Sequence, residues 1–381
     1  MTPDVQAFVQ SVSAIRDRIS TPTLVMSRTV IEERASKVGR GIPGCRVFYA
    51  MKANDHPGVC RIAARAGLGF EIGSIGEIRS LEQEGLLPVP MITSNPVKSP
   101  EFIHYAWDHG IRVFTADSVA EVEKLAREVP DAEFVIRLAV SNAESDWPLS
   151  GKFGIEVGAA RDLLVTAKRL GLRCSGATFH VGSQCTNARA WLPAIDLARV
   201  LFRMGQELGH PMDLLNLGGG YPATYLRRVP SARQIEAAVA PYLRGHFPSG
   251  TRFFVEPGRY LVGDAGVFVT SVIGKAWRSD GRLWVHLDIG VFNGLAEALG
   301  GIRYPVLTGR EGPVRPVTLA GVSCDGFDII DTRAEYPEPE IGDRWLLLTA
   351  GAYTTVYAAR FNGLDLPKVA FLEDLLSSRL L

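Results

Sequence analysis

The sequence lacks a charge imbalance, a paired-cysteine motif and a long apolar run. Its 381 residues include 41 Lys and Arg and 41 Asp and Glu, so the formal net charge is zero. Nucleic-acid binders and polybasic membrane-surface proteins need an excess of positive charge, and we therefore predict neither a nucleic-acid partner nor a membrane partner. No stretch of the sequence approaches the roughly 18 apolar residues of a membrane span.

The cysteines and histidines also lack the spacings of disulfide or metal sites. An odd number of cysteines without a CxxC pair favours a reducing, cytoplasmic location over a disulfide framework; they are Cys45, Cys60, Cys174, Cys185 and Cys324. The N-terminal MTPDVQAFVQ has no basic region before an apolar core, so we expect no cleaved signal peptide. Histidine pairs spaced as HxH or HExxH are absent, which disfavours a metal-dependent hydrolase, and we predict no metal site.

Eight short apolar runs alternate with segments whose apolar residues recur at helical spacing. The runs occupy residues 45–50, 67–73, 88–93, 110–116, 132–140, 174–181, 212–220 and 251–258. Such alternation is typical of parallel strands joined by crossover helices. Eight units in about 210 residues predict a closed (β/α)8 TIM barrel of the α/β class, with its catalytic groups at the C-terminal ends of the strands. A doubly wound open sheet is the alternative, although it normally has fewer units.

The pattern changes after about residue 265, where β-rich runs are separated by Gly, Pro and Asp clusters. We predict a barrel at residues 30–265, followed by an all-β C-terminal domain. Residues 1–29, which include the strand-like TPTLVMS, are assigned together with 266–381 to the β-rich domain.

The first predicted strand ends in YAMKAN, which places Lys52 at the mouth of the barrel. An amine there could form an imine with an aldehyde cofactor if its surroundings keep it neutral. The alternative interpretation of a lone lysine at a strand end is a solvated charge.

The seventh and eighth predicted strands end in LGGGYP and EPGR. Backbone N–H groups at Gly218, Gly219 and Gly220 could surround an anion, and the loops after these strands are the usual phosphate site of such barrels. A turn is the alternative for a lone GGG. Arg259 offers a charge-assisted partner for phosphate. Glu256, at the end of an apolar strand, needs a cationic or proton-donating partner, which a pyridinium nitrogen would provide.

Taken together, these segments resemble the fold type III pyridoxal-phosphate decarboxylases, the family of ornithine, lysine and diaminopimelate decarboxylases. The resemblance extends from TPTLVMS to AYTTVYAARFNG and includes, in the family's order, YAMKAN, FEIGSIGE, VIRLAV, SGKFG, HVGSQ, LGGGYP, EPGRYLVGDAG, CDGFD and GAYTT. Each segment alone is a weak signal, whereas the ordered set is specific. The resemblance implies a carboxy-lyase with pyridoxal 5'-phosphate as its cofactor.

The resemblance also implies roles for individual residues. Lys52 would hold the cofactor as a Schiff base, His180 would stack on the cofactor ring, and Glu256 would keep the pyridine nitrogen protonated. The implied catalytic residues are Lys52, Cys324, His180 and Glu256. The implied cofactor-binding residues are Lys52, Glu77, Arg137, His180, Ser183, Gly218, Gly219, Gly220, Glu256, Pro257, Gly258, Arg259 and Tyr353.

The CDGFD segment carries Cys324 and Asp325. In the family this segment completes the active site of the neighbouring subunit, so the resemblance implies a homodimer with shared active sites. Cys324 would protonate the substrate at Cα, and Asp325, with Glu297 and Tyr353, would contact the substrate. Without the motif, Cys324 would be interpreted as a small buried hydrophobe.

The predicted substrate is L-ornithine or L-lysine, converted to a diamine in polyamine biosynthesis, because the CDG segment is similar to the ornithine and lysine enzymes. Diaminopimelate decarboxylases usually carry a glutamate after the cysteine. Two departures from the family pattern are visible. Glu71 and Gly73 replace a usual Asp and Ala, and residues 290–297 lack a Tyr-Asp pair, for which Glu297 is a candidate replacement.

Other functions remain as alternatives. The substrate could be a modified, carrier-tethered or D-configured amino acid, or diaminopimelate. An amino-acid racemase is disfavoured because ANDHPG, and not a KANAYGHG-type segment, follows Lys52. A catalytically silent homologue that regulates an active decarboxylase is disfavoured because Lys52 and Cys324 are both retained.

Overall fold

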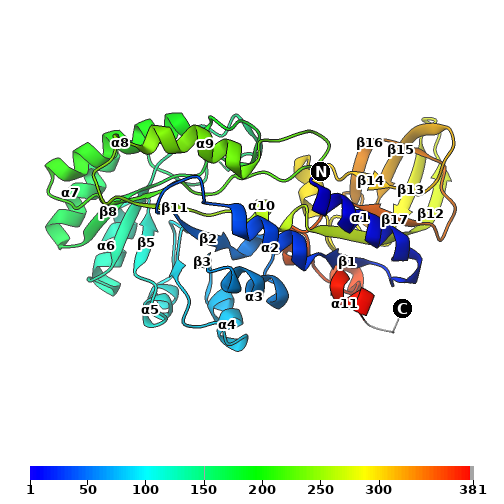
Figure 1. The fold of residues 1–381 in the computed structure, drawn as a ribbon, viewed down its shortest axis with the longest axis horizontal. Helices are drawn as coiled ribbons and strands as arrows, with labels where there is room; N and C mark the ends of the chain where they lie inside the picture. The colour runs from blue at the N-terminus through cyan, green and yellow to red at the C-terminus, as the bar shows by residue number, and fades with distance from the viewer. Residues whose placement is uncertain (150, 378–381) are drawn as a thin grey trace. The chain divides into compact units, whose positions relative to one another are not determined.

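The computed structural model describes residues 1–149 and 151–377. These residues form two compact units, which Figure 1 shows as ribbons. The barrel unit consists of Ala35–Pro222 and Val229–Gly258. The β unit consists of Met1–Arg34, Ala223–Arg228 and the chain from Arg259 onward.

The barrel unit contains an eight-stranded parallel sheet. Its strands are β2 (Arg46–Ala50), β3 (Gly69–Glu71), β4 (Met91–Ile92), β5 (Val113–Ala116), β6 (Glu133–Arg137), β8 (Arg173–Thr178), β10 (Leu214–Asn216) and β11 (Arg252–Val255). They are ordered β4-β3-β2-β11-β10-β8-β6-β5, so the chain's first and last barrel strands, β2 and β11, are neighbours. All eight predicted strands are present, and the predicted TIM barrel is confirmed.

The barrel closes between β4 and β5, where the N–H of Thr93 donates to the carbonyl of Val113 at 3.4 Å. A buried apolar cluster in its interior is composed of Phe48, Ile92, Val135, Leu214 and Phe254. Three of these residues come from the consecutive strands β2, β11 and β10, whereas the other two come from β4 and β6, which lie elsewhere in the sheet order. Their side chains therefore meet across the barrel axis. The packed interior leaves the C-terminal ends of the strands as the place for chemistry.

Helices follow the strands and lie outside the barrel (Figure 1). They are α3 (Pro57–Arg65), α4 (Ile75–Gln83), α5 (Pro100–Asp108), α6 (Val119–Glu128), α7 (Ala160–Leu170), α8 (Trp191–Glu207) and α9 (Ala232–Leu243), while α2 (Arg28–Lys37) runs from one unit into the other. Ser74, Ser99 and Ser118 cap α4, α5 and α6 by accepting a hydrogen bond from the N–H three residues later. Within the described ranges, no helix combines the length and the apolar character needed to cross a membrane.

The β unit contains a second, mostly antiparallel sheet. Six of its strands are ordered β14-β17-β12-β13-β15-β16, and β1 pairs with both β12 and β18. The strands are β1 (Thr23–Met26), β12 (Gly266–Trp277), β13 (Leu283–Leu287), β14 (Val306–Leu307), β15 (Val314–Ala320), β16 (Ile329–Pro337), β17 (Arg344–Leu347) and β18 (Lys368–Phe371). Helices α1 (Pro3–Ile15), α10 (Arg259–Val262) and α11 (Leu372–Ser377) belong to the same unit.

The observed division differs from the predicted ranges of 30–265 and of 1–29 plus 266–381 at three places. The barrel unit begins at Ala35 instead of residue 30. Ala223–Arg228 clusters with the β unit, because the N–H of Thr224 donates to Asp264 and its carbonyl accepts from Thr349. The chain also leaves the barrel unit after Gly258, so Arg259 begins a helix of the β unit. No change of amino-acid composition in the sequence marks these boundaries.

Candidate active site

Lys52 follows β2, in a short 3-10 helix, η2 (Met51–Ala53). Its Nζ donates to Oε2 of Glu71, the last residue of β3. The lysine side chain is 54% exposed, whereas that of Glu71 is 4% exposed. The hydroxyl of Tyr49 donates to the carbonyl of Asn54 at 2.8 Å and holds the turn that carries the lysine. A reactive amine thus lies at the open end of the barrel, oriented by a buried carboxylate.

Glu256 follows β11 and is almost completely buried. The hydroxyl of Ser94 and the side-chain amide of Asn216 both donate to its Oε1. Burial raises the pKa of the Glu256 carboxyl, and nearby Glu71 raises it further. Lys52, Ser94 and Asn216 oppose this shift. Two neutral donors therefore stabilise a buried carboxylate on one of its two oxygens.

His180 follows β8 and is held by the backbone and by Asn142. Its Nδ1 accepts a hydrogen bond from the N–H of Gly182 at 3.0 Å, and its carbonyl accepts from Nδ2 of Asn142 at 2.9 Å. Burial lowers the pKa of the imidazole to about 3, with further lowering by Arg137 and Lys52. The ring is therefore neutral across the physiological range.

The three glycines after β10 pack against the ends of neighbouring strands. Gly218 has φ 66°, and a Cβ there would lie 2.0 Å from the carbonyl oxygen of Phe179. A Cβ on Gly219 would lie 2.7 Å from the carbonyl oxygen of Glu256. Asn216 accepts from the N–H of Gly218 at 3.0 Å while donating to Glu256, so it links the glycine loop to the buried carboxylate. Close backbone packing requires glycine here, independently of any ligand.

Three other predicted residues of the barrel unit are Glu77, Arg137 and Ser183. Glu77, in the first turn of α4, accepts from the N–H of Gly73 at 2.6 Å, and burial raises its pKa to about 7. Arg137 ends β6, and its Nη1 donates to the carbonyl of Ser94 at 3.5 Å. Burial lowers the pKa of this guanidinium, and Glu256 opposes the shift. Ser183 begins β9 (Ser183–Cys185), which pairs with β7 (Ser145–Trp147).

The barrel unit therefore gathers most of the predicted residues at the C-terminal ends of its strands. This set also includes two residues that the sequence analysis missed, Ser94 and Asn216. A serine or asparagine at a strand end is commonly a turn residue, so neither has a distinctive sequence signal. Ser94 follows the predicted strand 88–93 directly, which is a feature that could have identified it. Asn216 lies inside the predicted run 212–220 and only the structure shows that it ends β10.

Arg259 and Glu297 form a buried pair within the β unit. Both oxygens of Glu297 accept from the guanidinium, each at 2.6 Å, and each side chain is 2% exposed. Arg259 also donates to the hydroxyl of Tyr225 at 2.7 Å, and its guanidinium carbon lies 4.7 Å from the ring centroid of Tyr353. The predicted phosphate role of Arg259 and substrate role of Glu297 stay predictions, and the structure gives each a partner that the sequence did not indicate.

Cys324 and Asp325 lie in an exposed loop of the β unit. The N–H of Cys324 donates to Asn362 at 3.0 Å, and Oδ1 of Asp325 accepts from the N–H of Phe327 at 2.8 Å. The buried Asp328 holds this loop by two hydrogen bonds: its side-chain oxygens accept from the N–H groups of Val291 and Ser323, each at 2.8 Å. The cysteine is exposed, so it is not the small buried hydrophobe of the alternative interpretation.

The barrel residues fit a pyridoxal group by the chemistry of their donors and acceptors. They provide an amine at the open end of the barrel, a neutral imidazole and a buried carboxylate whose bonds come from uncharged donors. A carboxylate buried in this way needs a cation or a proton donor, and a protonated pyridine nitrogen is both.

Comparison with known proteins identifies the family. The model of the pyridoxal binding domain of pyridoxal-dependent decarboxylases matches residues 28–263. The chain belongs to this family and is a pyridoxal-dependent carboxy-lyase.

Individual relatives narrow the comparison. The lysine/ornithine decarboxylase of Selenomonas ruminantium is 37% identical over 377 residues, which cover 96% of this chain and 93% of that protein. The crystal structure of the lysine/ornithine decarboxylase complexed with cadaverine from Vibrio vulnificus has a TM-score of 0.86 and 29% identity, covering 97% of this chain and 99% of that one. Antizyme inhibitor 2 of Xenopus laevis is 34% identical over 342 residues, which cover 85% of this chain and 75% of that protein.

These matches confirm the predicted family, the barrel with a separate β-rich domain, the pyridoxal cofactor and the decarboxylation of a basic amino acid. The roles of individual site residues and the homodimer are not tested by them and stay predictions.

Proposed function

We propose that this enzyme removes the α-carboxylate of L-lysine and L-ornithine and releases cadaverine and putrescine in polyamine biosynthesis. The observation that carries the proposal is the arrangement of Lys52, Glu71 and Glu256 at the C-terminal ends of the barrel strands. The similarity to lysine/ornithine decarboxylases supports this substrate class.

The barrel residues have complementary tasks in this proposal. When bound, pyridoxal phosphate supplies an electron-withdrawing ring that accepts the electron pair left at Cα as carbon dioxide departs. Lys52 supplies the amine that anchors the aldehyde carbon, and Glu71 orients that amine. Glu256 holds a proton at the pyridine nitrogen. His180 packs on the ring as a neutral imidazole, so it adds no positive charge beside a pyridinium.

We assign the remaining predicted residues to binding and positioning. Glu77 and Arg137 support the surroundings of the lysine. The phosphate is bound by Ser183, Gly218, Gly219, Gly220, Pro257, Gly258, Arg259 and Tyr353. Glu297 positions the guanidinium of Arg259, because both of its oxygens already accept from that group. Asp325 is then the stronger candidate for the carboxylate that pairs with the distal ammonium of the substrate.

Cys324 supplies the proton that replaces carbon dioxide at Cα, and it does so in a homodimer. An exposed cysteine supports this proposal, because a residue lent to a neighbouring subunit cannot be buried in its own. Phe327, three residues away, is 74% exposed and borders a cavity of about 290 Å³ with Leu299, which is 58% exposed. Large exposed apolar side chains beside a cavity are typical of a protein interface. Five free cysteines support a cytoplasmic location.

The test is a mass-spectrometric assay of the enzyme loaded with pyridoxal phosphate and offered L-lysine, L-ornithine and diaminopimelate separately. We expect carbon dioxide with cadaverine from lysine and with putrescine from ornithine. The Lys52→Ala variant serves as the control and should lose both the visible cofactor absorbance and the products. A loaded enzyme that yields no diamine from either substrate would overturn the proposal and direct the search to modified amino acids.

A regulatory homologue without activity is the second candidate, because a relative that matches over 85% of this chain is named antizyme inhibitor 2. The two candidates differ in cofactor binding and turnover. If the full chain neither binds pyridoxal phosphate nor releases carbon dioxide, the regulatory function is favoured.

A further inference from the structure

The loop between β4 and α5 carries one of the two donors to the buried Glu256. Ser94, two residues after β4, donates its hydroxyl to Oε1 of Glu256, while its own carbonyl accepts from Arg137 at 3.5 Å. The loop is short, because α5 begins at Pro100. The orientation of one serine hydroxyl therefore depends on how the few residues after it are held.

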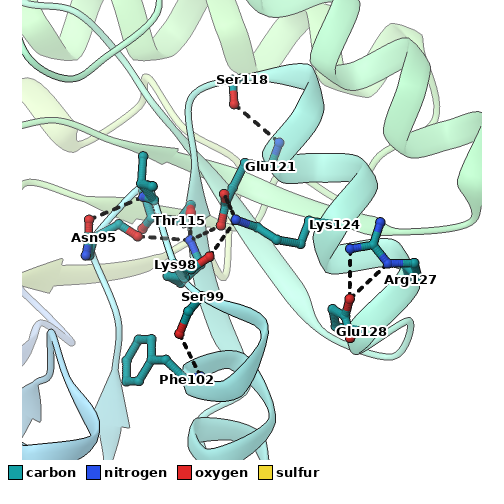
Figure 2. Close-up of polar contacts among 11 residues, drawn as sticks. Asn95, Lys98, Ser99, Phe102, Thr115, Ser118, Glu121, Lys124, Arg127 and Glu128 are labelled. Carbon is teal, nitrogen blue, oxygen red and sulfur yellow. Dashed lines mark hydrogen bonds and ion pairs between the residues drawn. The ribbon is translucent and has the colours of Figure 1, made fainter.

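A buried lysine holds the other end of this loop (Figure 2). The Nζ of Lys98 donates to the carbonyl of Asn95 at 2.9 Å and to the carbonyl of Thr115, at the end of β5, at 2.5 Å. It also forms an ion pair with Oε1 of Glu121 on α6 at 2.9 Å. One ammonium thus ties the loop residue next to Ser94 to the following strand and helix of the barrel.

The surroundings of Lys98 are unusual for a purely structural lysine. Its side chain is fully buried, that of Glu121 is 4% exposed, and burial lowers the pKa of the ammonium to about 8 although Glu121 opposes the shift. Glu121 also pairs with Lys124 at 2.6 Å. A buried ion pair is commonly no more stabilising than apolar residues of the same volume, so net stabilisation does not account for the burial of this pair.

We propose that Lys98 and Glu121 are positioning residues that hold the loop 93–98 so that Ser94 donates to Glu256. The inference rests on the proposed function, in which the Glu256 carboxylate holds the proton of the pyridine nitrogen. Ser94 and Asn216 both donate to Oε1, so these two hydrogen bonds orient the carboxylate through one of its oxygens and do not involve Oε2. Loss of the serine hydroxyl would let the carboxylate rotate and would favour its protonated form.

Besides the neutral hydroxyl of Ser94, several charged groups affect the pKa of Glu256. Lys52 after β2 and Arg137 on β6 favour the carboxylate, whereas Glu71 on β3 opposes it. None of these residues is altered in Ser94→Ala, so a change in the titration of that variant reports the loss of the hydroxyl. Because a hydrogen bond to the charged form lowers a pKa, removing Ser94 Oγ raises the pKa of Glu256.

The first comparison uses holoenzyme with Ser94→Ala, Ser94→Thr and the control Ser80→Ala, which removes a hydroxyl on α4 that donates to the carbonyl of Gly76. We expect Ser94→Ala to lower kcat about 10-fold with little change in KM, because a hydrogen bond to a charged group is lost. The acid midpoint of the cofactor absorbance should move to higher pH. Ser94→Thr should recover both properties, and Ser80→Ala should change neither.

The second comparison tests whether Lys98 acts through Ser94. Lys98→Met should lower kcat and shift the absorbance midpoint in the same direction as Ser94→Ala. Lys168→Met is its control, since Lys168 also donates to a backbone carbonyl, that of Gly209. Glu121→Gln replaces Lys98→Met if that variant does not fold. The double variant Ser94→Ala/Lys98→Met should be no slower than the slower single variant, because both changes remove the same contact.

Three results would overturn the inference. They are an unchanged absorbance midpoint in Ser94→Ala, a kcat loss that Ser94→Thr does not recover, and a double variant whose loss is the product of the two single losses. Failure of the proposed function is a separate outcome, because it appears in the unmodified enzyme as absent cofactor absorbance or absent diamine.

Discussion

Two buried glutamates of this chain are satisfied in opposite ways. Glu256 of the barrel unit receives its hydrogen bonds from the uncharged side chains of Ser94 and Asn216. Glu297 of the β unit receives both of its bonds from the guanidinium of Arg259. Neutral donors supply no counter-charge to a carboxylate, so a cationic ligand can still do so, whereas a carboxylate paired with a guanidinium already has its counter-charge within the fold. The difference separates a residue suited to catalysis from one suited to positioning.

Replacement of the first glutamate should have the largest effect, and on rate. We expect Glu256→Gln to lower kcat by about 10³-fold, because it removes a charge placed where the cofactor becomes positive. The free energy of unfolding should change by less than about 1 kcal/mol, since the amide retains a hydrogen-bonding side chain of similar size. Steady-state kinetics and urea unfolding measure the two quantities.

The control is Glu133→Gln. Glu133 starts β6 at the opposite end of the barrel and accepts from Ser175 at 2.8 Å and Arg252 at 2.7 Å. The Glu133→Gln variant should leave kcat unchanged. A Glu256→Gln enzyme with the rate of the unmodified protein would remove this carboxylate from the mechanism.

Replacement of Glu297 should mainly lower the free energy of unfolding. Glu297→Gln leaves the buried Arg259 without a counter-charge, and we expect the free energy of unfolding to fall by about 3 kcal/mol. Urea unfolding monitored by circular dichroism measures the loss. The double variant Arg259→Met/Glu297→Met should recover most of it, because no unpaired charge remains buried. Equal losses in the single and double variants would show that packing, and not charge pairing, is the cause.

A third buried glutamate, Glu77, should make the stability of the protein depend on pH. Its pKa is raised by burial from 4.5 to about 7, so the folded protein retains a proton that the unfolded chain releases. This contribution to stability is complete below pH 4.5 and is lost as the pH rises to about 7. The stability difference between the unmodified protein and Glu77→Gln should therefore change by roughly 3 kcal/mol across this interval. Parallel stability curves would contradict the burial of this carboxyl group.

An exposed ion pair should have the smallest effect. Nη2 of Arg28 lies 2.6 Å from Oδ2 of Asp374, and the two side chains are 35% and 66% exposed. We expect Asp374→Asn to lower the free energy of unfolding by about 0.5 kcal/mol, and by less at high salt. Thermal unfolding at two salt concentrations checks this. A loss as large as that of Glu297→Gln would mean that burial does not account for the difference between the pairs.

The sequence predicted the barrel well because its parallel strands are buried on both sides. Such strands are continuous apolar runs, and all eight were located, although their predicted bounds were several residues too long where loops continued the apolar pattern. The β unit was less predictable, since β18 contributes only Lys368–Phe371 and pairs with β1 from the other end of the chain. Pairing between distant segments leaves no local signal.

The site shows the same limit. Lys52, His180 and Glu256 follow strands and belong to specific motifs, so their positions could be predicted. The pairing of Arg259 with Glu297 joins residues 38 positions apart and depends on the folded β unit. Ser94 is a common polar residue in an irregular loop, and only the structure shows that its hydroxyl donates to a carboxylate 162 positions away.

The closure of the barrel has a consequence for dynamics. Strand β4 has only two residues. Within the described residues, β4 and β5 are the two ends of the sheet order and are not paired as strands. A backbone hydrogen bond of 3.4 Å, from the N–H of Thr93 to the carbonyl of Val113, joins the two edges. Amide exchange should therefore be faster at Thr93 than at Ile72, whose N–H donates to Ile92 at 2.9 Å. Local opening at this edge would separate Ser94 from Glu256 without unfolding the barrel. The rate of that opening would then set how long the carboxylate keeps one of its two donors.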